Sequence, residues 1–487
     1  MKPFQIFNTL SRSVEKFEPL DRSDPPTVTF YSCGPTVYLP QHLGNMRAYV
    51  FVDTLRRALE FNGYRVRHVM NITDVGHMTS DEDAGEDKIE KTARAEGKTP
   101  LEVANFYIEQ FKRDCALLNI QLPPDAASYD QPHPPQGALC RATDNIPAMI
   151  GVIEEIIAHG YGYVTPSGVY FDVEKWRGPG GIGRLSRQSL EEQRTAQRLE
   201  HSPDKHSPHD FALWVLNQPH HMMQWDSPWG RGYPGWHIEC SAMSMKYLGE
   251  TIDIHSGGLD HIPVHHENEI AQSESATGHP FVRYFVHNAF LTGMAGAKIS
   301  KSAGKFPVVA DLVAAGINPL AFRMLCLGAK YRSELAFSLD AVKAAEKNLY
   351  YLWGFTRAAQ ADENDSPWTQ SYLERFRDAL NDDLNTPEAL ALVVEMVNKA
   401  YRDSDHRIWN TLKKFDQILG LRIEEQFKFL RELKTPPEIE ALINERKAAR
   451  DRKDFGRSDE LRQELVARGW SVKDKKGEQS IYEPAWN

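Results

Sequence analysis

The sequence predicts a protein of the α/β class, in which a parallel sheet is interrupted by an inserted subdomain and followed by a helical bundle and a small mixed domain. An alternating, β-branched run at Thr27–Tyr31 precedes a helical pattern, and a second strand pattern follows at Arg65–Asn71. Strand and helix patterns alternate again after residue 232, and helical periodicity dominates from about residue 308 to 419. A strand, a crossover helix and a second strand form the unit from which Rossmann-type parallel sheets are built.

The segment Tyr31–Arg47 joins the first predicted strand to the first predicted helix. Its Gly34-Pro35 pair holds the backbone open, and Gly44 lets a ligand approach the main chain. A helix that begins near Asn45 offers unpaired backbone N–H groups and the positive end of its dipole to an anion. We therefore expect this turn to bind phosphate, although a single histidine such as His42 on a loop is more often structural.

The inserted subdomain is predicted between residues 122 and 231. Five prolines mark a linker at its start, at positions 123, 124, 132, 134 and 135. A helix near Asp144–Ala158 and a hairpin at Val164–Val173 follow. The sheet then resumes with five predicted features: a helix around Cys240, a strand at Thr251–His255, a turn at Gly257-Gly258, a helix that opens at His265 and a strand at Phe281–Phe290.

A polar, glycine-bearing loop comes next, and it contains Lys298-Ile299-Ser300-Lys301-Ser302. Two lysines on one loop can form a movable clamp for polyphosphate, because their ammonium groups neutralise the charge that shifts onto departing pyrophosphate. The alternative is a solvated basic loop without a ligand. The loop alone does not separate these two interpretations.

Cysteine is sparse, with residues at positions 33, 115, 140, 240 and 326 only. An odd set without close pairs argues for a reducing compartment and against a disulfide framework. Cys33 lies in the turn after the first strand, and Cys240 lies near the start of a predicted helix. His265 and Glu269 are four residues apart and share one helix face. Two thiolates, one imidazole and one carboxylate suit Zn²⁺. Three further histidines compete with His265 as the nitrogen ligand: His255, His261 and His266.

The turn and the lysine loop together resemble the two signatures of class I aminoacyl-tRNA synthetases, His-Ile-Gly-His and Lys-Met-Ser-Lys-Ser. Asn45 and Ile299 depart from those forms. Asn45 cannot carry a positive charge, so it should stabilise developing negative charge less than a histidine would. Within this class the chain resembles the cysteinyl-tRNA synthetases over nearly its whole length, and the further segments that carry the resemblance are 71–75, 235–243, 257–260, 265–273, 381–390 and 453–462.

The resemblance implies a role for each candidate site residue. Zinc would bind the thiolate of the substrate and would be held by Cys33, Cys240, His265 and Glu269. ATP, accompanied by Mg²⁺, would be bound by His42, Asn45, Gly257, Gly258, Asp260 and Lys301. The catalytic residues would be His42, Asn45, Lys298 and Lys301, and the amino-acid pocket would be bordered by Thr36 and Trp236.

The reaction implied by the resemblance converts ATP and L-cysteine to cysteinyl-adenylate and pyrophosphate, and then transfers the cysteinyl group to the 3′-terminal ribose of tRNA(Cys). The substrate carboxylate is the nucleophile, so no protein nucleophile is required. Serine differs from cysteine by one atom, and an apolar pocket separates such near-isosteres poorly. A soft thiolate binds Zn²⁺ far better than a protonated hydroxyl does, which explains why the chain needs no obvious editing domain.

The resemblance also divides the chain into five parts. These are the first half of a nucleotide-binding catalytic domain at 1–121, a connective subdomain at 122–231, the second half with the lysine loop at 232–306, a helical connecting and bundle region at 307–425 and an anticodon-binding domain at 426–487. Activation and tRNA selection should therefore be separable. A chain that ends near Gly420 is expected to keep cysteine activation and to lose most tRNA charging.

Composition and charge constrain the partners and the compartment. The chain is 41% hydrophobic with a net charge of −10, and residues 441–487 hold 11 Lys and Arg against 9 Asp and Glu. Screening confines surface electrostatics to about 10 Å, so an acidic protein can still present a basic face to tRNA. No apolar run approaches membrane-spanning length, and residues 1–21 lack the apolar block of a signal peptide. We expect a cytoplasmic monomer that binds tRNA(Cys), ATP and L-cysteine and no membrane.

Two other functions compete with this interpretation. A ligase that joins cysteine to an amino sugar would share the zinc and nucleotide sites, but it would not need the long C-terminal extension. A zinc- and tRNA-binding paralogue that has lost catalysis is disfavoured by the intact lysine loop and by the presence of all four candidate ligands.

Overall fold

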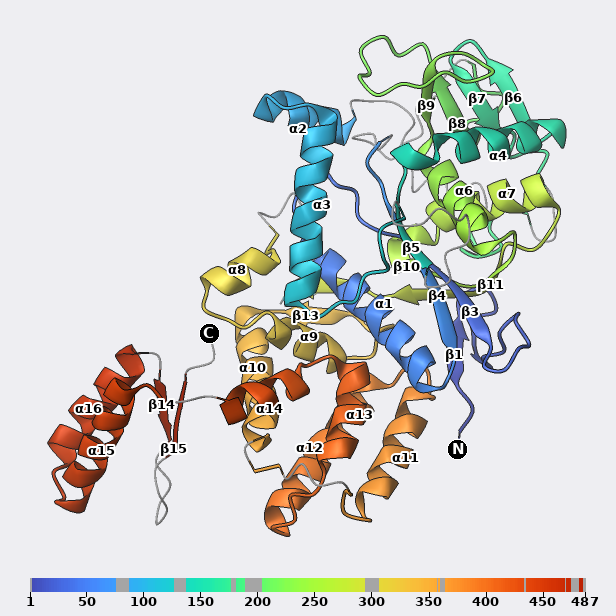
Figure 1. The fold of residues 1–487 in the computed structure, drawn as a ribbon. Helices are drawn as coiled ribbons and strands as arrows, with labels where there is room; N and C mark the ends of the chain where they lie inside the picture. The colour runs from blue at the N-terminus through green and yellow to red at the C-terminus, as the bar shows by residue number, and fades with distance from the viewer. Residues whose placement is uncertain are drawn as a thin grey trace.

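The computed structural model of the chain describes residues 2–75, 87–126, 137–176, 181–188, 204–293, 306–356, 358–359, 364–432, 435–468, 470–473 and 481–484. Figure 1 shows a parallel sheet in the middle of the molecule, with the inserted subdomain at one end and a bundle of helices at the other. Within the described residues, no helix is both long enough and apolar enough to cross a membrane.

Five parallel strands form the central sheet, in the order β11-β10-β3-β4-β5. They are β3 (Thr27–Ser32), β4 (Arg65–Ile72), β5 (Gly137–Arg141), β10 (Ile252–Gly258) and β11 (Val282–Asn288). The predicted α/β class is confirmed. The predicted turn at Gly257-Gly258 is wrong, because both residues end β10 and pair with the last residues of β11.

The strand order reverses at β3. Helix α1 (Leu43–Phe61) connects β3 to β4, and the first part of the chain thus extends the sheet on one side of β3. The later strands β10 and β11, connected by α7 (His265–Thr277), extend it on the other side. In open α/β sheets, ligands bind at such a reversal, outside the carboxyl ends of the strands. This position lies next to Cys33, the residue that follows β3.

The inserted subdomain contains an antiparallel sheet in the order β6-β7-β8-β9. Its strands are β6 (Gly162–Thr165), β7 (Gly168–Phe171), β8 (Phe211–Leu216) and β9 (Gly232–Pro234). The predicted hairpin is the β6-β7 pair, and the predicted helix is α4 (Ile146–Ala158), preceded by η2 (Thr143–Asn145). Helix α4 contacts α6 (Trp236–Leu248) and α7, which joins the subdomain to the central sheet. Helices α2 (Lys88–Glu96) and α3 (Pro100–Leu117) lie between β4 and β5 in the chain.

The helical region shares one hydrophobic core with the sheet, which includes Phe30, Leu55, Phe322 and Trp353. Its helices are α8 (Val309–Ala314), α9 (Leu320–Leu327), α10 (Leu339–Phe355), α11 (Thr369–Leu380), α12 (Thr386–Arg402), α13 (Trp409–Leu419) and α14 (Ile423–Glu432). Two short strands, β12 (Leu291–Gly293) and β13 (Leu335–Phe337), pair beside them. Helix α14 spans the predicted boundary after residue 425, and its Phe427 stacks on Trp409 with ring centroids 3.9 Å apart.

The C-terminal module lies beside the bundle in Figure 1. It consists of α15 (Pro437–Asp451), α16 (Phe455–Ala467), β14 (Trp470–Lys473) and β15 (Ile481–Pro484). Its own small core comprises Ile439, Leu465, Trp470 and Val472. At the other end of the chain, β1 (Gln5–Asn8) and β2 (Ser13–Lys16) form a hairpin that contacts β11.

Candidate active site

A cavity of about 720 Å³ opens at the carboxyl ends of β3 and β10. The two strands pair from Phe30–Ile254 to Ser32–Ser256, and the Cys33 N–H donates to the Ser256 carbonyl at 3.1 Å. The cavity brings together most of the site residues that the sequence predicts: Cys33, Thr36, His42, Asn45, Trp236, Gly257, Gly258, Asp260 and His265. The strand reversal thus places the first motif opposite residues roughly 190 to 230 positions further along the chain.

The turn after β3 is tightly packed. The Gly34 N–H donates to Asn71 Oδ1 at 2.8 Å, and a Cβ on Gly34 would lie 1.7 Å from the Asn71 carbonyl oxygen. Any larger residue at position 34 would therefore displace either β4 or the turn. Thr36 continues this contact through an isolated parallel bridge to Thr73.

His42 caps helix α1. Its Nδ1 accepts the Asn45 N–H at 3.1 Å, and its ring stacks on Phe306 with centroids 4.3 Å apart. The helix therefore begins at Leu43, two residues earlier than predicted, and the Asn45 amide is already bonded. A neutral His42 ring that accepts at Nδ1 carries its proton on Nε2.

The second motif lies outside the described residues, so the predicted positions of Lys298 and Lys301 are not placed. The flanking residues are placed. Leu291 and Phe306 both line the cavity, so the chain leaves and re-enters the described part of the molecule at the cavity wall. The expectation that the lysines face a phosphate ligand there stays a prediction.

Four candidate metal ligands converge beside the cavity. The ligand atoms of Cys33, Cys240, His265 and Glu269 all lie within 4.8 Å of one another. They come from the end of β3, the first turns of α6 and the first turns of α7. His265 Nε2 lies 3.0 Å from Glu269 Oε1, as their spacing of four residues on one helix predicts. All except Cys33 are buried.

The ionisable groups of this cluster shift one another's pKa values, and burial together with Cys240 raises the pKa of Cys33 well above its usual value. Burial acts to raise the pKa of Glu269, but His255 and His265 hold it well below its usual value. Burial acts to lower the pKa of His265, yet Glu269 and Cys240 raise it to about 10. A hydrogen bond with Cys33 lowers the pKa of Cys240 to about 6 against the effect of burial. A thiolate is the form of cysteine that binds metal, so Cys240 is prepared for that role.

Three of the four candidate ligands each contact a histidine outside the set of four. His265 Nδ1 lies 2.8 Å from His237 Nδ1, and Glu269 Oε2 lies 2.6 Å from His255 Nε2. Cys33 Sγ lies 3.3 Å from His266 Nε2. Partners of this kind fix the orientation of metal ligands in proteins.

The structure narrows the choice of the nitrogen ligand without reducing it to one. A second group of ligand atoms, from Cys33, His255, His266 and Glu269, also lies within 4.8 Å. His261 belongs to neither group. It lines the cavity instead, and burial lowers its pKa to about 4.

Sequence reasoning missed two contributors to the cluster. His237 follows the predicted pocket residue Trp236 in α6 and contacts His265. His287 lies near the carboxyl end of β11, where it pairs with Gly257 of β10 and contacts His266. The signal for His287 was available, because β11 is a parallel strand and its carboxyl end faces the same edge as the candidate ligands. Burial lowers the pKa of both His266 and His287 far below the usual value for histidine.

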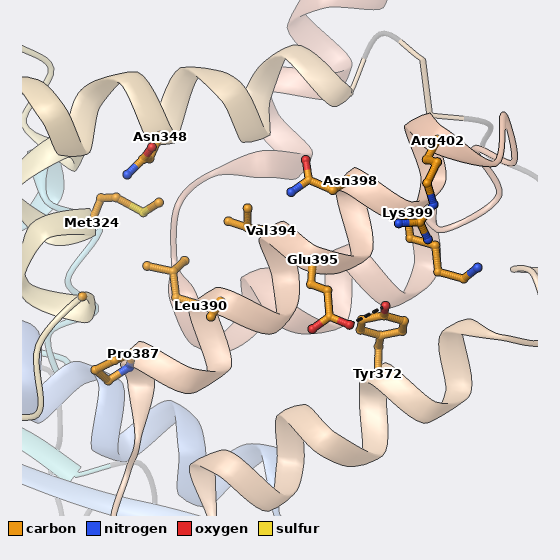
Figure 2. Close-up of a pocket in the computed structure, with 12 residues that line it drawn as sticks. Met324, Asn348, Tyr372, Pro387, Leu390, Val394, Glu395, Asn398, Lys399 and Arg402 are labelled. Atoms are coloured by element: carbon orange, nitrogen blue, oxygen red, sulfur yellow. Dashed lines mark hydrogen bonds between the residues drawn. The ribbon is translucent and has the colours of Figure 1, made fainter.

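A second pocket, of about 640 Å³, lies among helices α9 to α12 of the bundle. Figure 2 shows Leu390 and Val394 on its wall, with Lys399 and Arg402 together at one end. Glu395 accepts a hydrogen bond from the Tyr372 hydroxyl at 2.9 Å. The described residues that line this pocket include no cysteine or histidine, so its chemistry differs from that of the cavity at the sheet.

Three family profiles match consecutive parts of this chain. The profile of the family described as tRNA synthetases class I (C) catalytic domain matches residues 19–347. The profile of a DALR domain matches residues 375–424, and that of a cysteinyl-tRNA ligase anticodon binding domain matches residues 434–481.

Individual cysteine–tRNA ligases are similar to nearly the whole of this chain. The cysteine–tRNA ligase 1 of Burkholderia lata is 42% identical over 99% of this chain and 97% of its own length. The cysteine–tRNA ligase of Treponema denticola is 41% identical over 97% of this chain and 98% of its own. Among solved structures, Mycobacterium tuberculosis methionyl-tRNA synthetase bound by methionyl-adenylate superposes with a TM-score of 0.53 and 15% identity, covering 83% of this chain and 91% of that one. That likeness concerns the fold.

Proposed function

This chain belongs to the cysteine–tRNA ligase family, and from that premise we propose that it activates L-cysteine with ATP and transfers it to the 3′-terminal ribose of tRNA(Cys). The observation that carries the proposal is the position of the Cys33, Cys240, His265 and Glu269 cluster beside the cavity at the strand reversal, with Cys33 and His265 in the cavity wall. A thiol-selecting group and a nucleotide-binding turn then share one cavity.

The proposed metal is Zn²⁺, and the donor set fits it. Two sulfurs, one imidazole nitrogen and one carboxylate oxygen are ligands that zinc uses in proteins. Glu269 is fully buried; its Oε1 lies 3.0 Å from His265 Nε2 and its Oε2 is bonded to His255. The buried carboxylate thus faces imidazole nitrogens, and a cation between Glu269 and His265 would take the place of that contact.

We assign the zinc to Cys33, Cys240, His265 and Glu269 rather than to the group with His255 and His266. The two groups share Cys33 and Glu269, so one ion excludes the other. Cys33 and His265 both line the cavity, whereas His255 and His266 do not. An ion in the first group can therefore keep a coordination position open toward substrate, as catalytic zinc sites require.

The zinc, when bound, supplies a Lewis acid that accepts a substrate thiolate and discriminates against a protonated hydroxyl. The residues of the chain orient the rest of the amino acid. Trp236 stacks on His265 with ring centroids 4.6 Å apart, so it borders the space next to the proposed ligands. Thr36 lines the same cavity.

The ATP site is proposed at the other side of the cavity. The substrate carboxylate oxygen attacks the α-phosphorus, a new O–P bond forms, and the bond to pyrophosphate breaks. The Nε2–H of His42 and the side chain of Asn45 are proposed to donate to phosphate oxygens, since both residues line the cavity. Gly257 and Gly258 line the cavity and are proposed to contact the nucleotide, and a Cβ on Gly257 would lie 2.4 Å from His261 Nδ1, so a larger residue there would displace that ring. Asp260 lines the cavity beside them.

Two lysines, Mg²⁺ and tRNA complete the proposed reaction. Lys298 and Lys301 would neutralise the departing pyrophosphate, with Mg²⁺ accompanying ATP. The match to an anticodon binding domain at residues 434–481 supports tRNA as the acceptor and disfavours the amino-sugar ligase. We further propose a cytoplasmic monomer with the five predicted domains in their predicted order, and with two boundaries moved, because β9 pairs in the inserted sheet and Phe427 of α14 packs in the main core.

Cysteine-dependent exchange between ATP and labelled pyrophosphate tests the first step. The full-length protein with Mg²⁺ should catalyse exchange with L-cysteine and much less with L-serine at equal concentration, and it should then charge tRNA(Cys). Exchange without preference for cysteine would contradict the zinc proposal. Zinc binding without any exchange would favour the non-catalytic paralogue.

A further inference from the structure

A chain of buried hydrogen bonds runs from the N-terminal hairpin to Cys33. Thr9 Oγ1 lies 2.8 Å from His287 Nδ1, His287 Nε2 lies 2.8 Å from His266 Nδ1, and His266 Nε2 lies 3.3 Å from Cys33 Sγ. Thr9, His266 and His287 are at most 2% exposed. We call these three residues the Thr9 chain.

The far end of the Thr9 chain is held by the backbone. The Thr9 N–H donates to the Phe285 carbonyl at 2.8 Å, and Asn8 Oδ1 accepts the Phe285 N–H at 3.1 Å. The hydroxyl of Thr9 therefore stands at a fixed distance from His287, two residues further along β11. Only a conformational change of the N-terminal hairpin would move the Thr9 hydroxyl away from His287.

The chemistry of imidazole gives the Thr9 chain a direction. A neutral histidine has one N–H donor and one acceptor nitrogen. A cysteine sulfur that binds metal has no proton, so the hydrogen between it and His266 must belong to Nε2. His266 Nδ1 then accepts from the Nε2–H of His287, and His287 Nδ1 accepts from the hydroxyl of Thr9. Each proton position follows from the one before it.

We propose that His266 and His287, anchored by Thr9, are positioning residues that hold an N–H donor on the Cys33 sulfur and thereby set how strongly that sulfur binds the metal. The inference rests on the zinc site of the proposed function. Of the four proposed ligands, Cys33 is the only one that is not buried, so its orientation depends most on such a contact. A hydrogen bond to a thiolate withdraws electron density from the sulfur, and it also fixes the direction in which the sulfur faces the metal. Loss of an orienting partner commonly lowers metal affinity by roughly 10- to 100-fold.

The test uses full-length protein loaded with Co²⁺, whose thiolate-to-metal absorption reports the electron density on sulfur. Thr9→Val removes the hydroxyl at nearly constant volume, and Thr9→Ser restores it as the matched control. Thr9→Val should shift the thiolate band to lower energy and weaken Co²⁺ binding by about 10-fold, and His266→Leu by up to about 100-fold. The Thr9→Ser protein should show the same thiolate band and the same Co²⁺ affinity as the protein without substitutions.

His287→Asn interrupts the middle of the Thr9 chain and serves as a second variant should Thr9→Val fail to fold, as judged by circular dichroism. Folded variants with an unshifted band and unchanged Co²⁺ affinity would overturn the role of the Thr9 chain and leave the zinc site intact. If the protein without substitutions shows no thiolate-to-Co²⁺ absorption, the zinc site itself is wrong, and the role of the Thr9 chain fails with it.

Discussion

Two buried clusters of charged side chains differ in whether their polar atoms converge beside a cavity. In the first, which we call the arginine cluster, Asp53 of α1 faces Arg323 Nη2 at 2.6 Å and Arg57 Nε at 2.7 Å. Its other oxygen accepts the Gln121 N–H at 3.0 Å. The second is the proposed zinc cluster, whose sulfur, nitrogen and oxygen atoms point at one another.

The arginine cluster joins elements rather than binding a ligand. Arg323 donates to the carbonyl of Leu419 at 2.6 Å and to that of Leu118 at 3.2 Å, which ties α9 to the ends of α13 and α3. None of its three members lines the cavity. Cations there neutralise an anion already present in the protein, whereas the zinc cluster presents two cysteines and a carboxylate for an added cation. Burial of charge therefore identifies a functional site only when the ligand atoms converge next to a cavity.

The sharpest test of this comparison removes a sulfur from the zinc cluster. Cys240→Ser should strip or weaken the metal and raise the concentration of cysteine needed for half-maximal exchange by more than about 100-fold, because a hydroxyl is a poor zinc ligand. Metal content and exchange kinetics measure both effects. Cys326→Ser, another buried cysteine outside the cluster, is the matched control. Stoichiometric zinc with unchanged exchange in Cys240→Ser would refute the site.

The arginine cluster should respond in the opposite way. Asp53→Asn leaves two buried guanidinium groups without their shared anion, and it should lower the free energy of unfolding by about 3–5 kcal/mol. The cysteine dependence of exchange by the folded fraction should not change. Urea denaturation and exchange kinetics provide the two measurements. A change at the exposed pair of Lys16 and Glu18 should leave stability unaltered. A raised requirement for cysteine in Asp53→Asn would erase the distinction between the clusters.

Truncation should separate the proposed activation site from the proposed tRNA contacts. The structure corrects the position of the cut, because Leu421 accepts a hydrogen bond from Trp353 Nε1 and is buried with Phe427 in the main core. A chain that ends after Glu432 keeps α14 and removes the C-terminal module with its separate core. Exchange should be retained, and charging of tRNA(Cys) should fall by about 100-fold as anticodon contacts are lost. Charging equal to that of the full chain would mean that the module does not select tRNA.

The smallest effect is expected in the lysine loop. Lys301→Ala should lower the rate of adenylate formation by about 10- to 100-fold and leave cysteine binding nearly unchanged, because the charge that it meets develops as pyrophosphate departs. Pre-steady-state formation of adenylate distinguishes the rate from the affinity. Ser302→Ala, in the same loop, is a control that keeps both lysines. A loss of cysteine affinity alone would place Lys301 outside the proposed role.

Local patterns were sufficient for a large part of this protein. The alternation at Thr27–Tyr31 predicts β3, and the four-residue spacing of His265 and Glu269 predicts that they share a helix face, because both follow from the repeat of a single element. The motifs also indicate the family. Where local patterns failed, the errors were local too: the cap by His42 moved the start of α1, and pairing with β11 extended β10 through Gly258.

The sequence by itself determined the α/β class, the family and the residue types suited to zinc. Only the tertiary structure decided that Cys33 and Cys240 meet, because this depends on α6 packing against β3 and its neighbour β4. The tertiary structure also decided that His266 contacts Cys33. It brings Thr9 to the same cluster by a hydrogen bond to His287 of β11. Periodicity describes contacts a few residues apart, whereas the register between distant strands depends on how the whole core packs.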